Sequence, residues 1–156
     1  MKARKDFSSL RIAITGSGGQ VGRALQEAFA PHELLLMPHR DFDVTDPATA
    51  RYLVEQKPDV VIHAAAMTAV DRCTEEPDEA FRINEGGTEN ISQACADADL
   101  EMVYISTNEV FDGMSMEALP EDTRPRPINV YGRSKLAGER EAAARVSRLY
   151  IVRTSW

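Results

Sequence analysis

Five short apolar runs alternate with segments of helical periodicity along this chain of 156 residues, and no other feature restricts its fold as strongly. The runs are continuously apolar, which is typical of strands covered on both faces. Between them, apolar residues recur at the three- and four-residue spacing of a helix face. We predict strands at 10–15, 33–37, 60–63, 101–106 and 149–152, and helices at 21–29, 47–57, 77–96 and 131–146.

This alternation predicts βαβ units, a parallel sheet and right-handed crossovers. We expect an α/β fold, a Rossmann-type doubly wound sheet of about five strands in the order 2-1-3-4-5, flanked by helices. Residues 1–8 are expected to be a flexible polar lead-in and 9–156 a single NAD(P)-binding domain. The longest irregular stretch, 112–129, follows the carboxyl end of a strand, where open α/β sheets bind ligands.

Composition and charge exclude several classes of protein. The formal net charge of −7 argues against a nucleic-acid partner. We expect no membrane association, because no apolar run approaches the roughly 20 residues that span a bilayer. Cys73 and Cys95 have neither metal-ligand nor CxxC spacing, so we predict free thiols, a reducing cytoplasm and no metal site.

The stretch TGSGGQVG at residues 15–22 follows a predicted strand and opens a predicted helix. Its glycines at Gly16, Gly19 and Gly22 allow a tight turn and a close approach of the backbone to a pyrophosphate. Glycine-rich turns are common, but this strand–loop–helix context is the one that a dinucleotide site requires. We interpret the loop as a dinucleotide-binding motif.

The adenosine half of such a site requires partners at the end of the second strand. Arg40 lies there and could accept a 2′-phosphate, which favours NADPH over NADH, or it is a solvated surface arginine. Asp41 and Asp43 follow, and either could reach the adenosine instead. Three alanines after His63 would let a flat cofactor lie against the backbone, whereas His63 itself is expected to be structural.

Tyr131 and Lys135 are four residues apart, which places them on one face of a helix. On spacing alone, this pair is either a solvated helix face or an acid/base device, since an ammonium favours a nearby phenolate. The stretch STNEVFDG at 106–113 follows the fourth strand and offers hydroxyl groups at the carboxyl edge of the sheet. There, a hydroxyl could bond a substrate carbonyl, or the stretch is only a polar loop.

These motifs together resemble the dTDP-4-dehydrorhamnose reductase family of the extended short-chain dehydrogenases/reductases. The resemblance runs nearly end to end through TGSGGQVGRAL, DFDVTDP, KPDVVIHAAAMTAVDRCTEEPDEAFRINEGGTENI, YISTNEVFDG, INVYGRSKLAGE and VRTSW. It implies hydride transfer from NADPH or NADH to the C4 ketone of a nucleotide-linked 4-keto-6-deoxysugar.

The resemblance also implies roles for individual residues. Tyr131 would be the catalytic acid, Lys135 would bind the nicotinamide ribose and lower the tyrosine pKa, and Thr107 would polarise the ketone. The implied cofactor contacts are Gly16, Gly19, Gln20, Val21, Asp43, Val44, Ala64, Ala65 and Ala66. The positions implied beside the sugar are Thr68, Val70, Asn108, Glu109 and Trp156.

Two departures from the family pattern matter. The family usually reads Ser-Thr-Asp-Tyr, whereas this chain has Asn108 and Glu109 at the last two positions. Sugar-nucleotide 4,6-dehydratases resemble Ser-Thr-Asp-Glu, but Asn108 cannot donate a proton as an acid, which favours a reductase. The chain also ends at Trp156, where family members continue into a smaller substrate domain, so we expect that domain to be missing.

Two alternatives to the reductase stay open, a non-catalytic nucleotide-binding or regulatory module and a dehydratase-like enzyme. Without the substrate domain we expect weak cofactor binding and negligible turnover of sugar by this chain. We also expect the loop at 112–129 and Trp156 to be poorly covered, which leaves apolar surface that favours self-association or a partner chain.

Overall fold

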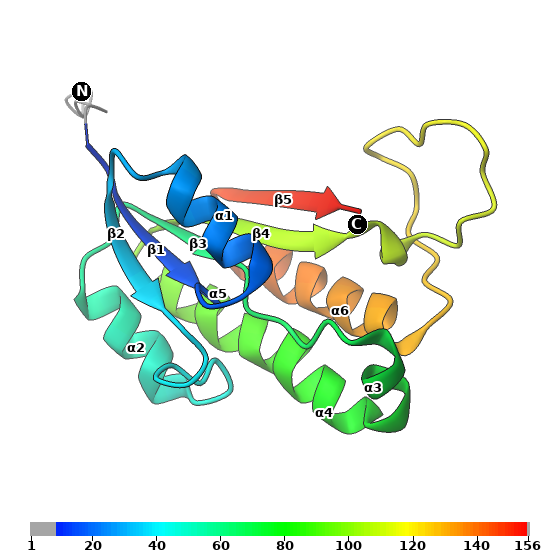
Figure 1. Cartoon of the computed structure of the whole chain (residues 1–156), viewed down its shortest axis with the longest axis horizontal. Coiled ribbons are helices and arrows are strands. Elements are labelled where there is room, and N and C mark those ends of the chain that lie inside the picture. The colour runs from blue at the N-terminus through cyan, green and yellow to red at the C-terminus, as the bar shows by residue number, and fades with distance from the viewer. Residues whose placement is uncertain (1–8, 156) are drawn as a thin grey trace.

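The computed structural model describes residues 9–155, and five parallel strands form the sheet at the centre of this part of the chain (Figure 1). The observed strand order is β2-β1-β3-β4-β5, which confirms the predicted order. The predicted lead-in at 1–8 and Trp156 lie outside the described residues. The strands are β1 (Arg11–Thr15), β2 (Glu33–Met37), β3 (Val60–His63), β4 (Glu101–Thr107) and β5 (Leu149–Thr154).

Helices flank the sheet on both faces, with α2, α5 and α6 below it and α1 above it in the view of Figure 1. Two short helices, α3 and α4, precede α5 along the chain. The helical elements are α1 (Gln20–Ala28), α2 (Pro47–Glu55), α3 (Val70–Glu75), α4 (Pro77–Phe81), η1 (Arg82–Gly86), α5 (Gly87–Asp97), η2 (Asn108–Val110) and α6 (Val130–Arg145).

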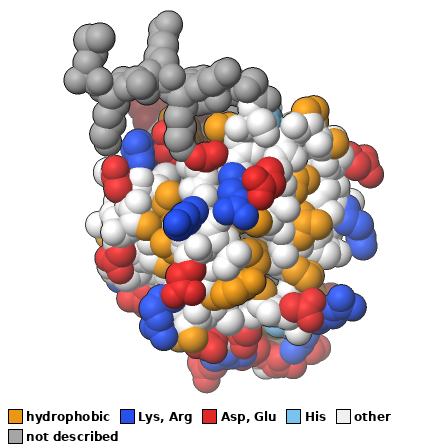
Figure 2. All heavy atoms as spheres, turned by 90° about the vertical axis from the view of Figure 1, so that its left-hand side faces the viewer, with side chains coloured by type: hydrophobic (Ala, Val, Ile, Leu, Met, Phe, Trp, Pro, Cys, Tyr) orange, Lys and Arg blue, Asp and Glu red, His pale blue; other side chains and the backbone are white. Residues whose placement is uncertain are grey.

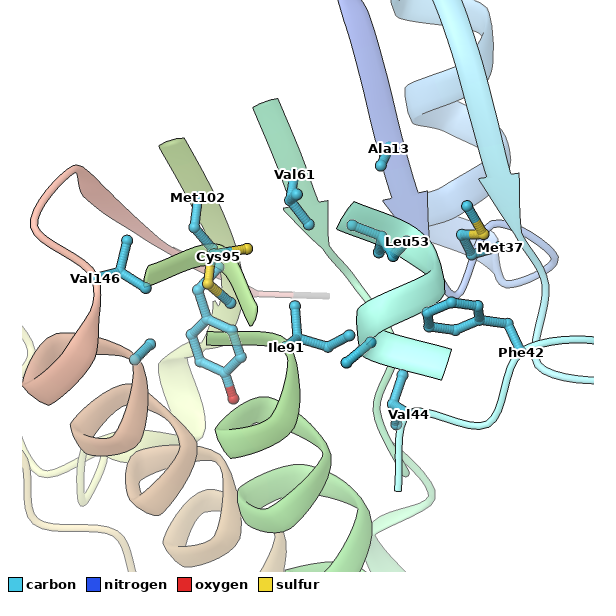
Figure 3. Packing of buried hydrophobic residues seen from close by; sticks show 13 residues of the cluster. Ala13, Met37, Phe42, Val44, Leu53, Val61, Ile91, Cys95, Met102 and Val146 are labelled. Atoms are coloured by element: carbon cyan, nitrogen blue, oxygen red, sulfur yellow. The ribbon is translucent and has the colours of Figure 1, made fainter. Parts of the chain in front are cut away.

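The core divides into two layers because neighbouring residues of a strand face opposite sides of the sheet. On one side, Ala13, Val61 and Met102 pack against Leu53 of α2 and Ile91 of α5 (Figure 3). On the other side, Ile12, Ile14 and Ile62 meet apolar side chains of α1 and the residue that follows it. Both faces of the central strands are therefore buried, as the continuous apolar runs predict.

The side of the sheet that α1 covers stays open over β4 and β5. Val103 lies opposite Tyr150 in the register and Ile105 lies opposite Val152. Val103 and Ile105 are half-buried, whereas Tyr150 and Val152 are 59% and 45% exposed. An apolar strip thus faces solvent along the edge strand.

The helix predicted at 77–96 is observed, but its middle differs from a regular α-helix. It is continuous from Pro77 to Asp97 but contains the π-helical turn η1. The wider turn carries Asn84, whose side chain is buried and bonds both backbone groups of Met67. Helix α3 was not predicted, because its six residues are too few for a periodic signal and no side chain caps its start.

Charges of both signs are mixed over the face seen from the left of Figure 1, with apolar side chains between them (Figure 2). That face therefore offers no broad basic surface of the kind that binds nucleic acid. Among the described residues, no helix is both long and apolar enough to cross a membrane.

Candidate active site

The glycine-rich loop joins β1 to α1 through a backbone that accepts few other residues. Gly16 has a φ of +66°, in the left-handed region that favours glycine, and a Cβ there would lie 2.7 Å from the Cα of Ala65. Gly19 precedes the first residue of α1, and within the described chain no side chain caps that helix end. The backbone N–H groups in the first turn of α1 are therefore available to an anion.

A cavity of about 810 Å³ opens beside this loop. Asp43 lines it, and Thr45 donates to Asp43 Oδ1 from its backbone N–H at 2.9 Å and from its hydroxyl at 2.8 Å. These bonds lower the pKa of Asp43, so the carboxylate stays charged at neutral pH. The cavity brings together the following predicted cofactor residues: Gly16, Gly19, Gln20, Val21, Gly22, Asp43, Val44, Ala64, Ala65 and Ala66.

Arg40 lies outside this lining. Its side chain is 87% exposed and pairs with Asp41, with the two charged groups 3.0 Å apart. The neighbouring His39 lines the cavity instead. A role of Arg40 toward a 2′-phosphate therefore stays a prediction, and it requires the arginine to exchange Asp41 for the ligand.

Thr107 and Tyr131 meet where β4 ends and α6 begins. Both are buried, at 1% and 5% exposure. Burial raises the pKa of Tyr131, and a hydrogen bond with the Thr107 side chain opposes that rise. A Cβ on Gly132 would collide with the carbonyl oxygen of Glu109, so the start of α6 lies directly against η2. The close approach fixes the hydroxyl groups of Thr107 and Tyr131 next to each other.

Lys135 lies one turn further along α6 and is only 2% exposed. Its ammonium donates to the carbonyl oxygen of Ile105 at 2.8 Å and lies 4.1 Å from the centre of the Tyr104 ring. Burial lowers the pKa of Lys135 to about 7, and the charge of Glu139 opposes that lowering. In this structure the ammonium is turned toward Ile105 and burial is the largest influence on the pKa of Tyr131, so the expected lowering of the tyrosine pKa by Lys135 stays a prediction.

The residues expected beside the sugar fall into two groups. Thr68 lines the cavity and Val70 is 39% exposed at the start of α3. Asn108 is exposed, but Glu109 is half-buried and its carboxylate accepts a 2.8 Å hydrogen bond from Asn129, the residue that caps α6. Trp156 lies outside the described residues, so its predicted contact has no structural counterpart here.

Met67 connects the cavity to the buried hydroxyl pair. It lines the cavity and belongs to the same apolar cluster as Tyr131 and Cys73.

Cys73 and Cys95 are buried free thiols, as predicted. His63 is fully buried, with Nδ1 2.7 Å from Thr15 Oγ1, and is a structural residue as expected.

The sequence profile of the family described as "RmlD substrate binding domain" matches residues 10–156. This chain belongs to that family. It is similar to the dTDP-4-dehydrorhamnose reductase of Mycolicibacterium smegmatis, with 41% identity over 99% of this chain and 48% of the relative. The chain thus spans about half the length of the curated relatives it matches.

Solved structures of similar proteins share the fold. The dTDP-4-dehydrorhamnose reductase of Bacillus anthracis, crystallised in complex with NADP, superimposes with a TM-score of 0.91 at 38% identity over 95% of this chain and 54% of that chain. RMD from Pseudomonas aeruginosa, complexed with NADPH, has a TM-score of 0.79 at 34% identity over 92% of this chain and 52% of that chain. The Rossmann-type fold predicted from the sequence is therefore confirmed.

The cavity also contains residues that the sequence did not single out. Arg82 forms two 2.7 Å hydrogen bonds to Glu79, three residues earlier, and donates to Thr45 Oγ1 at 2.5 Å. The sequence offered no signal for Arg82, because its side chain is 53% exposed and resembles any solvated helix charge. The additional lining residues are Gly18, His39, Phe42, Met67, Arg72, Glu79, Arg82 and Ile83.

Proposed function

We propose that residues 9–156 form the cofactor-binding domain of a reductase that acts on a nucleotide-linked 4-keto-6-deoxysugar, as in dTDP-4-dehydrorhamnose reduction. The observation that carries this proposal is the buried Thr107–Tyr131 pair, whose tyrosine packs in one apolar cluster with Met67 of the cavity that the glycine-rich loop frames. The names of the similar reductases from Mycolicibacterium smegmatis and Bacillus anthracis support it.

The cavity residues fit a dinucleotide. The uncapped N-terminus of α1 suits the pyrophosphate, and the close approach of Gly16 to Ala65 leaves backbone rather than side chains on that wall. Asp43 presents a charged acceptor at the adenosine end. When bound, NADPH or NADH would supply the hydride. NADPH is slightly favoured through Arg40, and the NADP and NADPH complexes of two similar proteins support this preference.

Tyr131 is the proton donor of the proposed reaction. Its raised pKa keeps the phenol protonated at neutral pH, so the group holds the proton that a ketone oxygen needs as it becomes an alkoxide. Thr107 supplies a second hydroxyl at the same place. Lys135 would have to turn from Ile105 toward the cavity to bind a ribose. Buried, oriented donors of this kind stabilise developing negative charge.

Two alternatives receive less support. A dehydratase-like elimination requires a free acid pair, but Asn108 is an amide and Glu109 is bonded to Asn129. A non-catalytic binding module would not need the buried Thr107–Tyr131 pair, so the presence of this pair favours an enzyme. The free thiols of Cys73 and Cys95 favour a cytoplasmic location. The open strip at Tyr150 and Val152 would favour self-association or a partner chain.

A chimera tests the proposed function. This chain replaces the matched region of the Mycolicibacterium smegmatis relative, and NADPH oxidation is measured with dTDP-4-dehydrorhamnose. We expect turnover by the chimera and negligible turnover by the 156-residue chain alone. NADPH binding by the chain, measured by calorimetry, shows whether its cavity is competent. A chimera that folds and binds NADPH but leaves the sugar unreduced would contradict the proposal and favour a binding module.

A further inference from the structure

A buried carboxylate lies two turns beyond Tyr131 on the same face of α6. Glu139 is 4% exposed, and the spacing of Tyr131, Lys135 and Glu139 aligns the three side chains along the helix. A carboxylate is rarely buried unless it is paired and hydrogen-bonded. No step of the reaction proposed above involves Glu139, so that reaction does not explain why this carboxylate is buried.

Partners from two strands satisfy this carboxylate. Ser106 donates its hydroxyl to Glu139 Oε1 at 2.6 Å. Arg153 of β5 donates to Oε1 at 2.9 Å and to Oε2 at 2.7 Å, a two-pronged geometry that orients the carboxylate as well as binding it. The guanidinium of Arg153 also lies 5.1 Å from the centre of the Phe111 ring. Ser106 and Arg153 are themselves opposite each other in the strand register.

Ser106 directly precedes Thr107, and Glu139 shares its helix with Tyr131. The bond between Ser106 and Glu139 therefore connects the two elements that carry the paired hydroxyl groups. Arg153 extends the connection to the edge strand β5, which otherwise has an open face. Loosening this cluster would let the end of β4 move relative to α6.

The charge of Glu139 also affects the protonation of Lys135. The ionisable side chains around Lys135 are His63 of β3, Tyr104 of β4 and Glu139 of α6, with Arg153 of β5 paired to the last. Burial keeps His63 and Tyr104 neutral. Glu139 is thus the group that favours the charged form of this buried lysine.

We propose that Glu139 is a positioning residue: its buried carboxylate, bonded to Ser106 and Arg153, fixes the end of β4 beside Tyr131. One helical turn from Lys135, its charge also favours the ammonium form of that lysine. The first half of this inference rests on the proposed reductase function, whereas the effect on Lys135 does not depend on any activity.

The effect on Lys135 can be measured directly in the 156-residue chain. Only four lysines occur in the sequence, so NMR of protein labelled at lysine resolves the titration of Lys135. We expect Glu139→Gln to move that titration to lower pH by about one pH unit. Glu141→Gln is the matched control, because Glu141 lies on the same helix but pairs with Arg145. Titration of Lys135 at the same pH in wild type and Glu139→Gln would overturn the electrostatic half of the proposal.

A second pair of variants keeps the inference testable if Glu139→Gln does not fold. Replacing both Glu139 and Arg153 by glutamine removes the ion pair as a unit, which proteins tolerate better than one unpaired buried charge. Lys135 should again titrate at lower pH, but by less than in Glu139→Gln, because the loss of the Arg153 cation partly offsets the loss of the carboxylate. Ser106→Ala instead leaves every charge in place, so it should leave the Lys135 titration unchanged and reduce kcat in the chimera about tenfold with little change in KM for NADPH.

The outcomes separate the two proposals. Wild-type kcat in the Ser106→Ala chimera would overturn the positioning role, whereas an inactive wild-type chimera contradicts the proposed function itself. A Lys135 titration that responds to Glu139→Gln and not to Glu141→Gln supports the electrostatic half of the inference in either case.

Discussion

Thr15 Oγ1 lies 2.7 Å from His63 Nδ1, so strands β1 and β3 share a buried hydrogen bond directly before the glycine-rich loop. The other ring nitrogen of His63 lies 3.2 Å from Thr88 Oγ1 of α5. Burial, with a smaller contribution from the charge of Lys135, lowers the pKa of His63 to about 3. The imidazole is therefore neutral where the loop is anchored.

The neutral state of His63 makes stability depend on acid pH. Between about pH 6.5 and 3 the unfolded chain binds a proton that the folded chain does not, so stability falls as pH falls through this range. The loss is up to about 1.4 kcal/mol per pH unit. Urea unfolding at pH 6.5, 5.5 and 4.5 should give a steeper decline for wild type than for His63→Gln. Parallel declines would mean that folding does not lower the pKa of His63.

The lowered pKa of Lys135 makes the stability of the folded chain depend on pH in the alkaline range. Its pKa is about 7 in the folded chain and near 10.4 when unfolded, so the unfolded chain binds more protons between these values. Stability should consequently rise from pH 7 toward pH 10 relative to Lys135→Met, again by up to about 1.4 kcal/mol per pH unit. Chemical unfolding at pH 7, 8 and 9 measures the difference, and a constant difference would refute a lowered pKa.

The glycine-rich loop gives a prediction about binding. A Cβ on Gly19 would lie 3.3 Å from the carbonyl oxygen of Gly16, and the larger valine side chain would enter the cavity. Gly19→Val should therefore weaken NADPH and NADH alike, at least tenfold by calorimetry. Gly86→Ala is the control, since a Cβ on Gly86 meets nothing within 4 Å. Unchanged affinity in Gly19→Val would remove the dinucleotide interpretation of the loop.

Much of this architecture could be predicted because it depends on local pattern. Continuous apolar runs specify buried parallel strands, and the glycines mark the turn between β1 and α1. The direction of the Lys135 ammonium could not be predicted, because it depends on the carbonyl of Ile105 from a strand 30 residues away. The π-helical turn at Asn84 likewise depends on a tertiary contact with Met67. Glu139 was overlooked because helical spacing alone does not distinguish a buried charge from a solvated one.

Arg40 tests the preference between the two cofactors. If it leaves Asp41 to bind a 2′-phosphate, Arg40→Ala should raise the Kd for NADPH about tenfold and leave the Kd for NADH nearly unchanged. Calorimetry with both cofactors measures this ratio, and Arg51→Ala, an exposed arginine of α2, is the control. An equal effect on NADPH and NADH would assign Arg40 to the solvated surface.

Substitution of Tyr131 by phenylalanine tests the central claim most directly, because it removes the phenolic hydroxyl and leaves the ring in its apolar cluster. In the chimera, Tyr131→Phe should bind NADPH as wild type does and reduce dTDP-4-dehydrorhamnose 10²- to 10⁴-fold more slowly, the usual contribution of a general acid. The measurement is kcat beside the calorimetric Kd for NADPH. A Tyr131→Phe chimera with near-normal kcat would contradict the account, because the tyrosine would then have no part in proton transfer.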